Sequence, residues 1–184
     1  MRLSEPRVTP VEESDVDGEA KELLERTRGD GGTPRIFRTL VRHPKLLKRW
    51  LVFGNHILAK STLPAREREL LILRIGWLCR AEYEFAAHTR IGREVGLSED
   101  ELERVKQGPD APGWSAFETT LLRAVDELHA DAIIADATWA ELAARFDTQQ
   151  LMDLVFTVGQ YNMVSMALNS LGVQPEVPVE GFPR

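Results

Sequence analysis

A glutamate and a histidine near the middle of the chain have the spacing of an acid–base pair. Glu84 and His88 lie four residues apart in segment 83–88, so on a helix they share one face. That face continues to the apolar Ile91 and Val95, which predicts that the pair points inward. Burial and mutual contact shift proton affinities, as acid–base catalysis requires. The alternative is a helix-stabilising contact worth only about 0.2–0.5 kcal/mol.

The segment before this pair predicts a central helix from about Pro64 to Cys79. It is apolar nearly all round, which is typical of a helix buried in a core. Glu69 lies in its first turns, where a carboxylate suits either a catalytic role or the positive end of the helix dipole. Arg74 is the single charge within Leu70–Cys79. A buried arginine must pair with a carboxylate or extend its head group to water, and both alternatives stay open.

Two further side chains near the pair could contribute to chemistry. Tyr83 precedes Glu84 and could be a catalytic phenol or a core aromatic. Cys79 is the only cysteine, so no internal disulfide and no Cys-x-x-Cys motif exist. Its place at the end of an apolar helix favours a buried small hydrophobe over a nucleophile. The four histidines lack metal-ligand spacing, so we expect no metal site.

Composition places the chain in the ordinary globular class. It has 184 residues, 43% of them hydrophobic and 28% charged, which suits one domain over residues 1–184. No apolar run approaches the roughly 20 residues that cross a bilayer. The first residues carry no apolar signal-peptide core. We therefore expect a cytoplasmic protein without membrane partners.

The net charge of −6 argues against nucleic-acid binding, since phosphate neutralisation needs clustered cations. One stripe of basic residues is an exception to this negative charge. We interpret it as a solvated face or a subunit contact. The alternative is attraction of an anionic substrate, of which DNA binding is a minor case. The stripe consists of Arg35, Arg38, Arg42, Lys45 and Arg49.

The pattern along the chain predicts an all-α fold of about seven to nine helices in one bundle. No sustained strand alternation occurs. An extended arm is expected at residues 1–17 and an extended, proline-rich tail at residues 173–184. A second apolar helix is expected from Thr148 to Leu171, and two helices this apolar favour a homo-oligomer. Further helices are expected at 19–28, 34–40, 44–59, 81–95, 98–106, 115–129 and 138–146.

Within this pattern, residues 63–105 resemble the carboxymuconolactone decarboxylase family of the alkyl-hydroperoxidase-D-like (AhpD-like) superfamily. The resemblance rests on Glu69, then Leu71-Ile72-Leu73-Arg74, then Tyr83-Glu84-Phe85, His88 and Gly96-Leu97-Ser98. Family members typically show a Tyr-Glu-Trp/Phe triplet followed three residues later by histidine. The resemblance implies a helical protomer that assembles into dimers, trimers or hexamers.

The resemblance also separates two kinds of chemistry. In the peroxidase branch, a glutamate and a histidine relay protons to a Cys-x-x-Cys pair. Aligning His88 with that histidine puts Glu69 at the glutamate position, and Ala81 and Glu84 at the two cysteine positions. Both redox cysteines are therefore absent, and a peroxidase using Cys79 alone is disfavoured.

Glu69, Glu84, His88 and Tyr83 instead suit the decarboxylase branch, which implies neither a metal nor an organic cofactor. There a small carboxylated lactone loses carbon dioxide, and the resulting carbanion is reprotonated. The resemblance suggests His88 as the acid, Glu84 or Glu69 as its partner, and Arg74 as the group that binds the substrate carboxylate. The principal alternative is an inactive oligomeric binding or scaffold protein.

Overall fold

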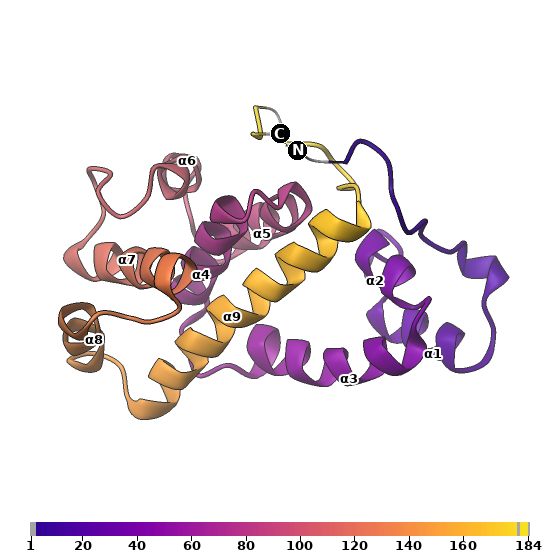
Figure 1. Cartoon of the computed structure of the whole chain (residues 1–184), viewed down its shortest axis with the longest axis horizontal. Coiled ribbons are helices and arrows are strands. Elements are labelled where there is room, and N and C mark those ends of the chain that lie inside the picture. Colours follow the sequence, from indigo (N-terminus) through magenta and orange to yellow (C-terminus); the bar gives the residue numbers. More distant parts are fainter. Residues whose placement is uncertain (1–2, 180, 184) are drawn as a thin grey trace.

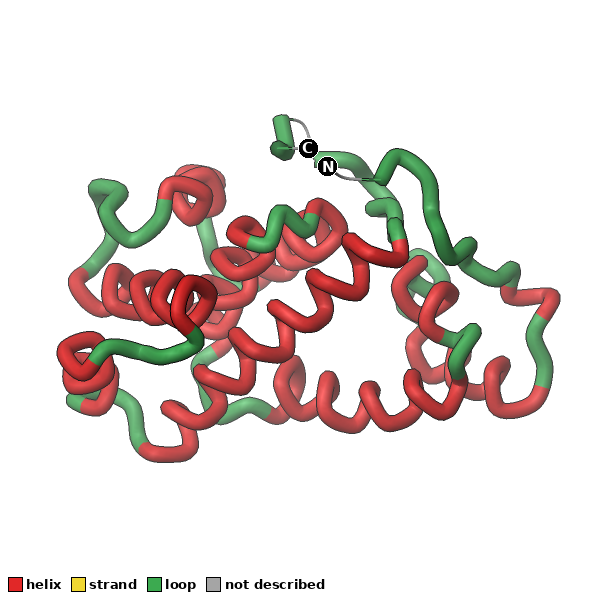
Figure 2. The backbone as a smooth tube through the Cα atoms, in the orientation of Figure 1, coloured by secondary structure: helices red, strands yellow, loops and turns green. Residues whose placement is uncertain are grey.

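The computed structural model describes residues 3–179 and 181–183, and in this part of the chain it is built from nine α-helices. No strand forms there, and an isolated bridge between Gly29 and Gly32 is the only extended pairing (Figure 2). The all-α prediction is therefore confirmed. The helices are α1 Gly18–Thr27, α2 Arg35–Leu40, α3 Pro44–Asn55, α4 Ala65–Leu78, α5 Glu82–Glu94, α6 Glu99–Gln107, α7 Ala116–Asp131, α8 Asp136–Ala143 and α9 Thr148–Leu171.

Helix α4 lies at the centre of the fold, as its apolar sequence predicts. All eight residues from Glu69 to Gly76 are buried, because α4 packs against α5, α6, α7 and α9. Helix α9 runs diagonally across the molecule in front of α4 and α5 (Figure 1). Leu71, Ile72 and Ile75 of α4 pack in one core cluster with apolar side chains of α7 and α9.

A tight turn brings α5 back alongside α4. Arg80 adopts a left-handed conformation with φ of 49°, and the Ala81 amide donates to the Gly76 carbonyl at 2.9 Å. Since only three residues separate the two helices, α4 and α5 form an antiparallel hairpin. Glu69 and His88, nineteen positions apart, can therefore face each other.

Capping residues in the sequence predict some helix starts correctly and others wrongly. Ser98 and Ser115 form the expected capping boxes of α6 and α7. The expected start at Thr138 is wrong, because α8 begins at Asp136. Thr138 instead donates its hydroxyl to Glu127 Oε1 at 2.8 Å, which ties α8 to α7.

The end of α3 also departs from the expected helix 44–59. The α-helix stops at Asn55, and a π-helical turn, His56–Lys60, continues the chain. Asp153 of α9 secures the segment after α3. Its carboxylate accepts from the Thr62 amide at 2.6 Å and lies 3.1 Å from His56 Nε2.

Three arginines of the basic stripe hold the two ends of the chain against the bundle. Arg38 and Arg42 donate to the carbonyls of Val11 and Thr9 in the N-terminal arm. Arg35 donates to the Pro175 carbonyl in the C-terminal tail at 2.7 Å. The described parts of both ends are largely irregular, as expected, apart from a short 3₁₀ turn at Glu13–Asp15. Positions 1, 2, 180 and 184 lie outside the described residues.

Among the described residues, none of the helices combines the length and the apolar character needed to span a lipid bilayer.

Gly172 provides a test of how the N-terminal arm is held. It ends α9 with φ of +72°, and a Cβ there would lie 2.8 Å from the Glu5 carbonyl oxygen. Gly172→Ala should therefore lower the free energy of unfolding by about 1–2 kcal/mol, measured by urea denaturation, and should speed proteolysis of the arm.

The matched control is Gly159→Ala on the same helix, where a Cβ meets nothing within 4 Å. It should be neutral or stabilising by up to about 1 kcal/mol. Equal behaviour of the two variants would contradict the close fit of the arm.

Candidate active site

A buried cluster of alternating charge joins α4 to α5. Glu69 is 0% exposed, and Glu84 and His88 are each 5% exposed. Glu69 Oε2 lies 2.6 Å from His88 Nδ1, and Glu84 Oε1 lies 3.0 Å from His88 Nε2. The expectation that Glu84 and His88 point inward is confirmed.

The geometry fixes the charge of the imidazole. Both ring nitrogens face a carboxylate oxygen, so both can donate only if the ring is protonated. Burial acts to lower the His88 pKa, but the hydrogen bonds and charges of Glu69 and Glu84 outweigh it and raise this pKa to about 9. His88 is therefore an imidazolium at neutral pH.

Glu69 contacts the buried cluster and is not the acidic residue at the start of α4. Its carboxylate contacts His88 and, through Oε1, the Nε of Arg68 at 3.2 Å. Glu67 is the acidic residue in the first turn of α4. Of the two roles left open for Glu69, its contacts therefore match membership of an acid–base cluster.

Tyr161 of α9 closes the cluster on one side. Its ring meets the His88 ring edge to face, with centroids 4.9 Å apart. Burial and the charges of Glu84 and Glu69 raise the pKa of its phenol well above the ordinary value. Tyr161 is therefore a neutral hydrogen-bond donor beside the imidazolium.

The structure does not bring Tyr83 into this cluster. Its hydroxyl donates to Glu176 at 3.0 Å and accepts from the Ile36 amide at 3.3 Å. It lines a separate cavity of about 30 Å³ under the C-terminal tail. Burial is the main cause that raises the pKa of this phenol. Tyr83 thus anchors the tail, and the adjacency of Tyr83 and Glu84 in sequence misled because neighbouring residues on a helix face different directions.

Arg74 is also directed away from the cluster. Its Nε and Nη2 bind the carboxylate of Asp126 at 2.6 and 2.8 Å, and Nη1 donates to the carbonyls of Val105 and Lys106. This pairing resolves the two alternatives left open for Arg74. The predicted role in substrate binding needs correction, because the guanidinium is engaged in joining α4 to α6 and α7.

Cys79 lies apart from the acid–base cluster as well. Its thiol donates to the Asn162 side chain at 2.9 Å and lies 4.0 Å from His129 Nδ1. Ala81, which aligns with the first redox cysteine of the peroxidase branch, is buried. Among the described residues, no group of three or more His, Cys, Asp or Glu side chains could hold a metal ion.

Arg68 is the cluster member that the sequence analysis missed. It lies in the alternating run Arg66-Glu67-Arg68-Glu69, which resembles the solvated start of a helix. Its side chain is only 12% exposed, yet it is more exposed than its neighbours in the cluster. The one available signal was its position next to Glu69.

The region that carries this site matches a known protein family. Residues 44–127 match the Carboxymuconolactone decarboxylase family, and this region contains Glu69, Glu84 and His88. No curated protein sequence matches the chain.

Solved structures show the same fold at low identity. An uncharacterized peroxidase-related protein from Ralstonia eutropha JMP134, described as an alkylhydroperoxidase AhpD core, gives a TM-score of 0.81 at 18% identity, over 95% of this chain and 98% of that chain. A peroxidase-related protein from Silicibacter sp. TM1040 gives 0.78 at 16% identity, over 98% and 96%. A cysteine-to-alanine variant of the debrominase Bmp8, in complex with 2,3,4-tribromopyrrole, gives 0.75 at 15% identity, over 95% and 94%.

Residues 44–127 therefore match the Carboxymuconolactone decarboxylase family, and the chain shares the fold of the AhpD-like structures.

The raised pKa of His88 makes stability depend on pH. Because the folded-state pKa of about 9 exceeds the ordinary value of 6.5, the stabilisation is complete below about pH 6.5 and is lost as the pH rises toward 9. We expect the free energy of unfolding, measured by urea denaturation, to fall across this range. In His88→Gln the decrease in the free energy of unfolding that comes from His88 should be absent.

The same pKa can be observed directly by NMR titration of the His88 ring. Glu84→Gln removes a charge and a charged acceptor, so it should lower the His88 pKa. Glu94→Gln, on the exposed face of the same helix, should leave it unchanged. An unchanged His88 pKa in Glu84→Gln would contradict the role assigned to Glu84.

Proposed function

We propose that this protein is a cofactor-free lyase that acts by proton transfer on a small carboxylated substrate, in the manner of a decarboxylase. The observation that carries the proposal is the His88 imidazolium held between Glu69 and Glu84. Glu84 occupies a position where the peroxidase branch has a redox cysteine. The cluster thus has the groups for moving protons and lacks a thiol pair for redox chemistry.

The proposed reaction uses the stored proton. The bond between a ring carbon and its carboxylate breaks, carbon dioxide leaves, and the electron pair stays on carbon as a carbanion or enolate. His88 supplies the proton that neutralises this charge, through the carboxylates that its ring nitrogens face. Solvent then returns a proton to His88.

Access to the cluster is restricted in the single protomer. Neither the 30 Å³ cavity beside Tyr83 nor an apolar cavity of about 150 Å³ between α3 and α9 is lined by Glu69, Glu84 or His88. The exposed part of Arg68 is the side on which the cluster comes nearest to solvent. The proposal therefore requires the substrate to enter beside Arg68.

We further propose that the protein works as a homo-oligomer through one apolar face. Residues on one side of α3 and one side of α9 are large, apolar and exposed, and such patches mark interaction surfaces. Phe53 and Phe156 stack edge to face across the two helices. The face consists of Leu46, Phe53, Met152, Phe156, Met163 and Met166.

The function is tested first with carboxymuconolactone, whose ultraviolet absorbance reports turnover. Wild type should turn it over, and His88→Ala should reduce kcat by at least about 100-fold because the proton donor is lost. The rate should fall above about pH 9, when the imidazolium deprotonates. Glu94→Gln is the control with normal activity, and no turnover by wild type would exclude this substrate.

The oligomer is tested by light scattering coupled to gel filtration. Phe156 is 53% exposed, so Phe156→Glu should leave the fold intact but shift the mass to the 20.8 kDa protomer. Trp139→Glu changes an exposed aromatic on α8 instead and should not alter the mass. A monomeric wild type would exclude the assembly.

A further inference from the structure

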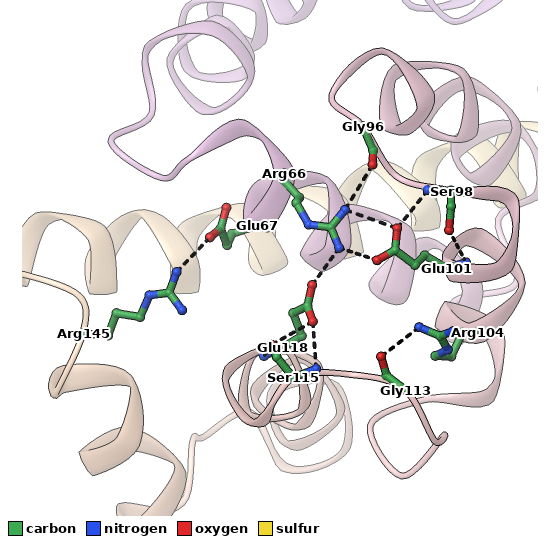
Figure 3. Close-up of polar contacts among 10 residues, drawn as sticks. All are labelled: Arg66, Glu67, Gly96, Ser98, Glu101, Arg104, Gly113, Ser115, Glu118 and Arg145. Carbon is green, nitrogen blue, oxygen red and sulfur yellow. Dashed lines mark hydrogen bonds and ion pairs between the residues drawn. The ribbon is translucent and has the colours of Figure 1, made fainter.

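Helix α4 carries three arginines that are at least two-thirds shielded from solvent, and they differ in how fully their guanidinium groups are engaged. Arg66 donates to both carboxylate oxygens of Glu101, to Glu118 and to the Gly96 carbonyl, as Figure 3 shows. Arg74 is engaged by Asp126 and two carbonyls. Both arginines therefore connect α4 to α6 and α7.

Arg68 differs from both. Its Nε donates to Glu69 at 3.2 Å, but its two terminal nitrogens make no hydrogen bond or ion pair with any described residue. The side chain is 88% shielded from solvent. We call the two terminal nitrogens of a guanidinium its fork, and an open fork is one whose nitrogens have no partner. A carboxylate fits an open fork because it can accept two parallel hydrogen bonds from it.

The neighbours of Arg68 place this fork beside the acid–base cluster. Glu69 bridges Arg68 and His88 through its two oxygens. The charge of Arg68 acts to lower the Tyr161 pKa, against the two glutamates, so Tyr161 lies within its electrostatic reach. A carboxylate bound by Arg68 would thus lie close to both the proton donor and a neutral phenol.

We propose that Arg68 binds a carboxylate of the substrate beside the acid–base cluster. During decarboxylation the negative charge moves from the reacting carboxylate to carbon. An ion pair between Arg68 and that carboxylate would stabilise the substrate more than the transition state and so would slow the reaction. Arg68 therefore holds the carboxylate that the product retains. This inference rests on the proposed function, but it is tested by binding alone.

The experiment is calorimetric titration with trans,trans-muconate and adipate, each compared with its uncharged diamide. Wild type should bind the dicarboxylates at least 10-fold more tightly than the diamides. Arg68→Gln should weaken dicarboxylate binding by about 10-fold to 100-fold, as expected for charge-assisted hydrogen bonds, and leave diamide binding unchanged. Arg68→Lys keeps the charge but not the fork, and should restore binding only in part.

Arg90→Gln is the matched control, because it removes the same charge from an exposed site on α5 and should bind like wild type. Thermal unfolding and light scattering of each variant show whether it is folded and assembled. Absence of dicarboxylate binding by wild type, or equal binding by Arg68→Gln, would overturn the proposal. A change of mass in Arg68→Gln would do the same, since Arg68 would then pair with another subunit.

Turnover separates this inference from the proposed function. Dicarboxylate binding that depends on Arg68, without turnover of carboxymuconolactone by wild type, supports the Arg68 site and contradicts the decarboxylase. Turnover with the same KM in Arg68→Gln supports the decarboxylase and contradicts the Arg68 site. If both are correct, Arg68→Gln should raise KM more than it lowers kcat.

Discussion

A protonated imidazole between two buried carboxylates is the interaction on which the centre of this protein depends. A carboxylate removed from water is costly unless it is paired, and Glu69 is fully buried. The positive charges of His88 and Arg68 balance the negative charges of Glu69 and Glu84. The α4–α5 hairpin is therefore held by charge as well as by apolar packing, and the same pairing keeps a proton on His88 at neutral pH.

The arginines of α4 show how one helix can serve both architecture and chemistry. Arg66 is engaged by carboxylates of α6 and α7 (Figure 3). Arg74 is engaged by the carboxylate of Asp126 on α7 and by two carbonyls of α6. Their removal would leave partly buried carboxylates unpaired, so their role is to hold the helices together. Arg68 has similar shielding but an open fork, and it touches the acid–base cluster. Charge and burial alone do not separate these roles, whereas the partners of each nitrogen do.

The fold that this chain shares with the AhpD-like structures carries an acid–base cluster here, in a chain that has a single cysteine. Glu84 contacts His88 from an aligned cysteine position, and Ala81 fills the other inside the turn between α4 and α5. Cys79 lies next to Asn162 instead of next to His88. The groups around His88 can exchange protons, and the proposed lyase activity is based on them.

The sequence by itself determined the helical fold, nearly all helix positions, the central place of α4 and α9, and the inward direction of Glu84 and His88. Helical periodicity, glycine stops and capping boxes act over a few residues, so they can be read along the chain. The partners of Arg74, Tyr83 and Arg68 were decided only by the tertiary structure. Each depends on what other helices or the C-terminal tail bring near, and spacing along one helix carries no record of which distant group will face it.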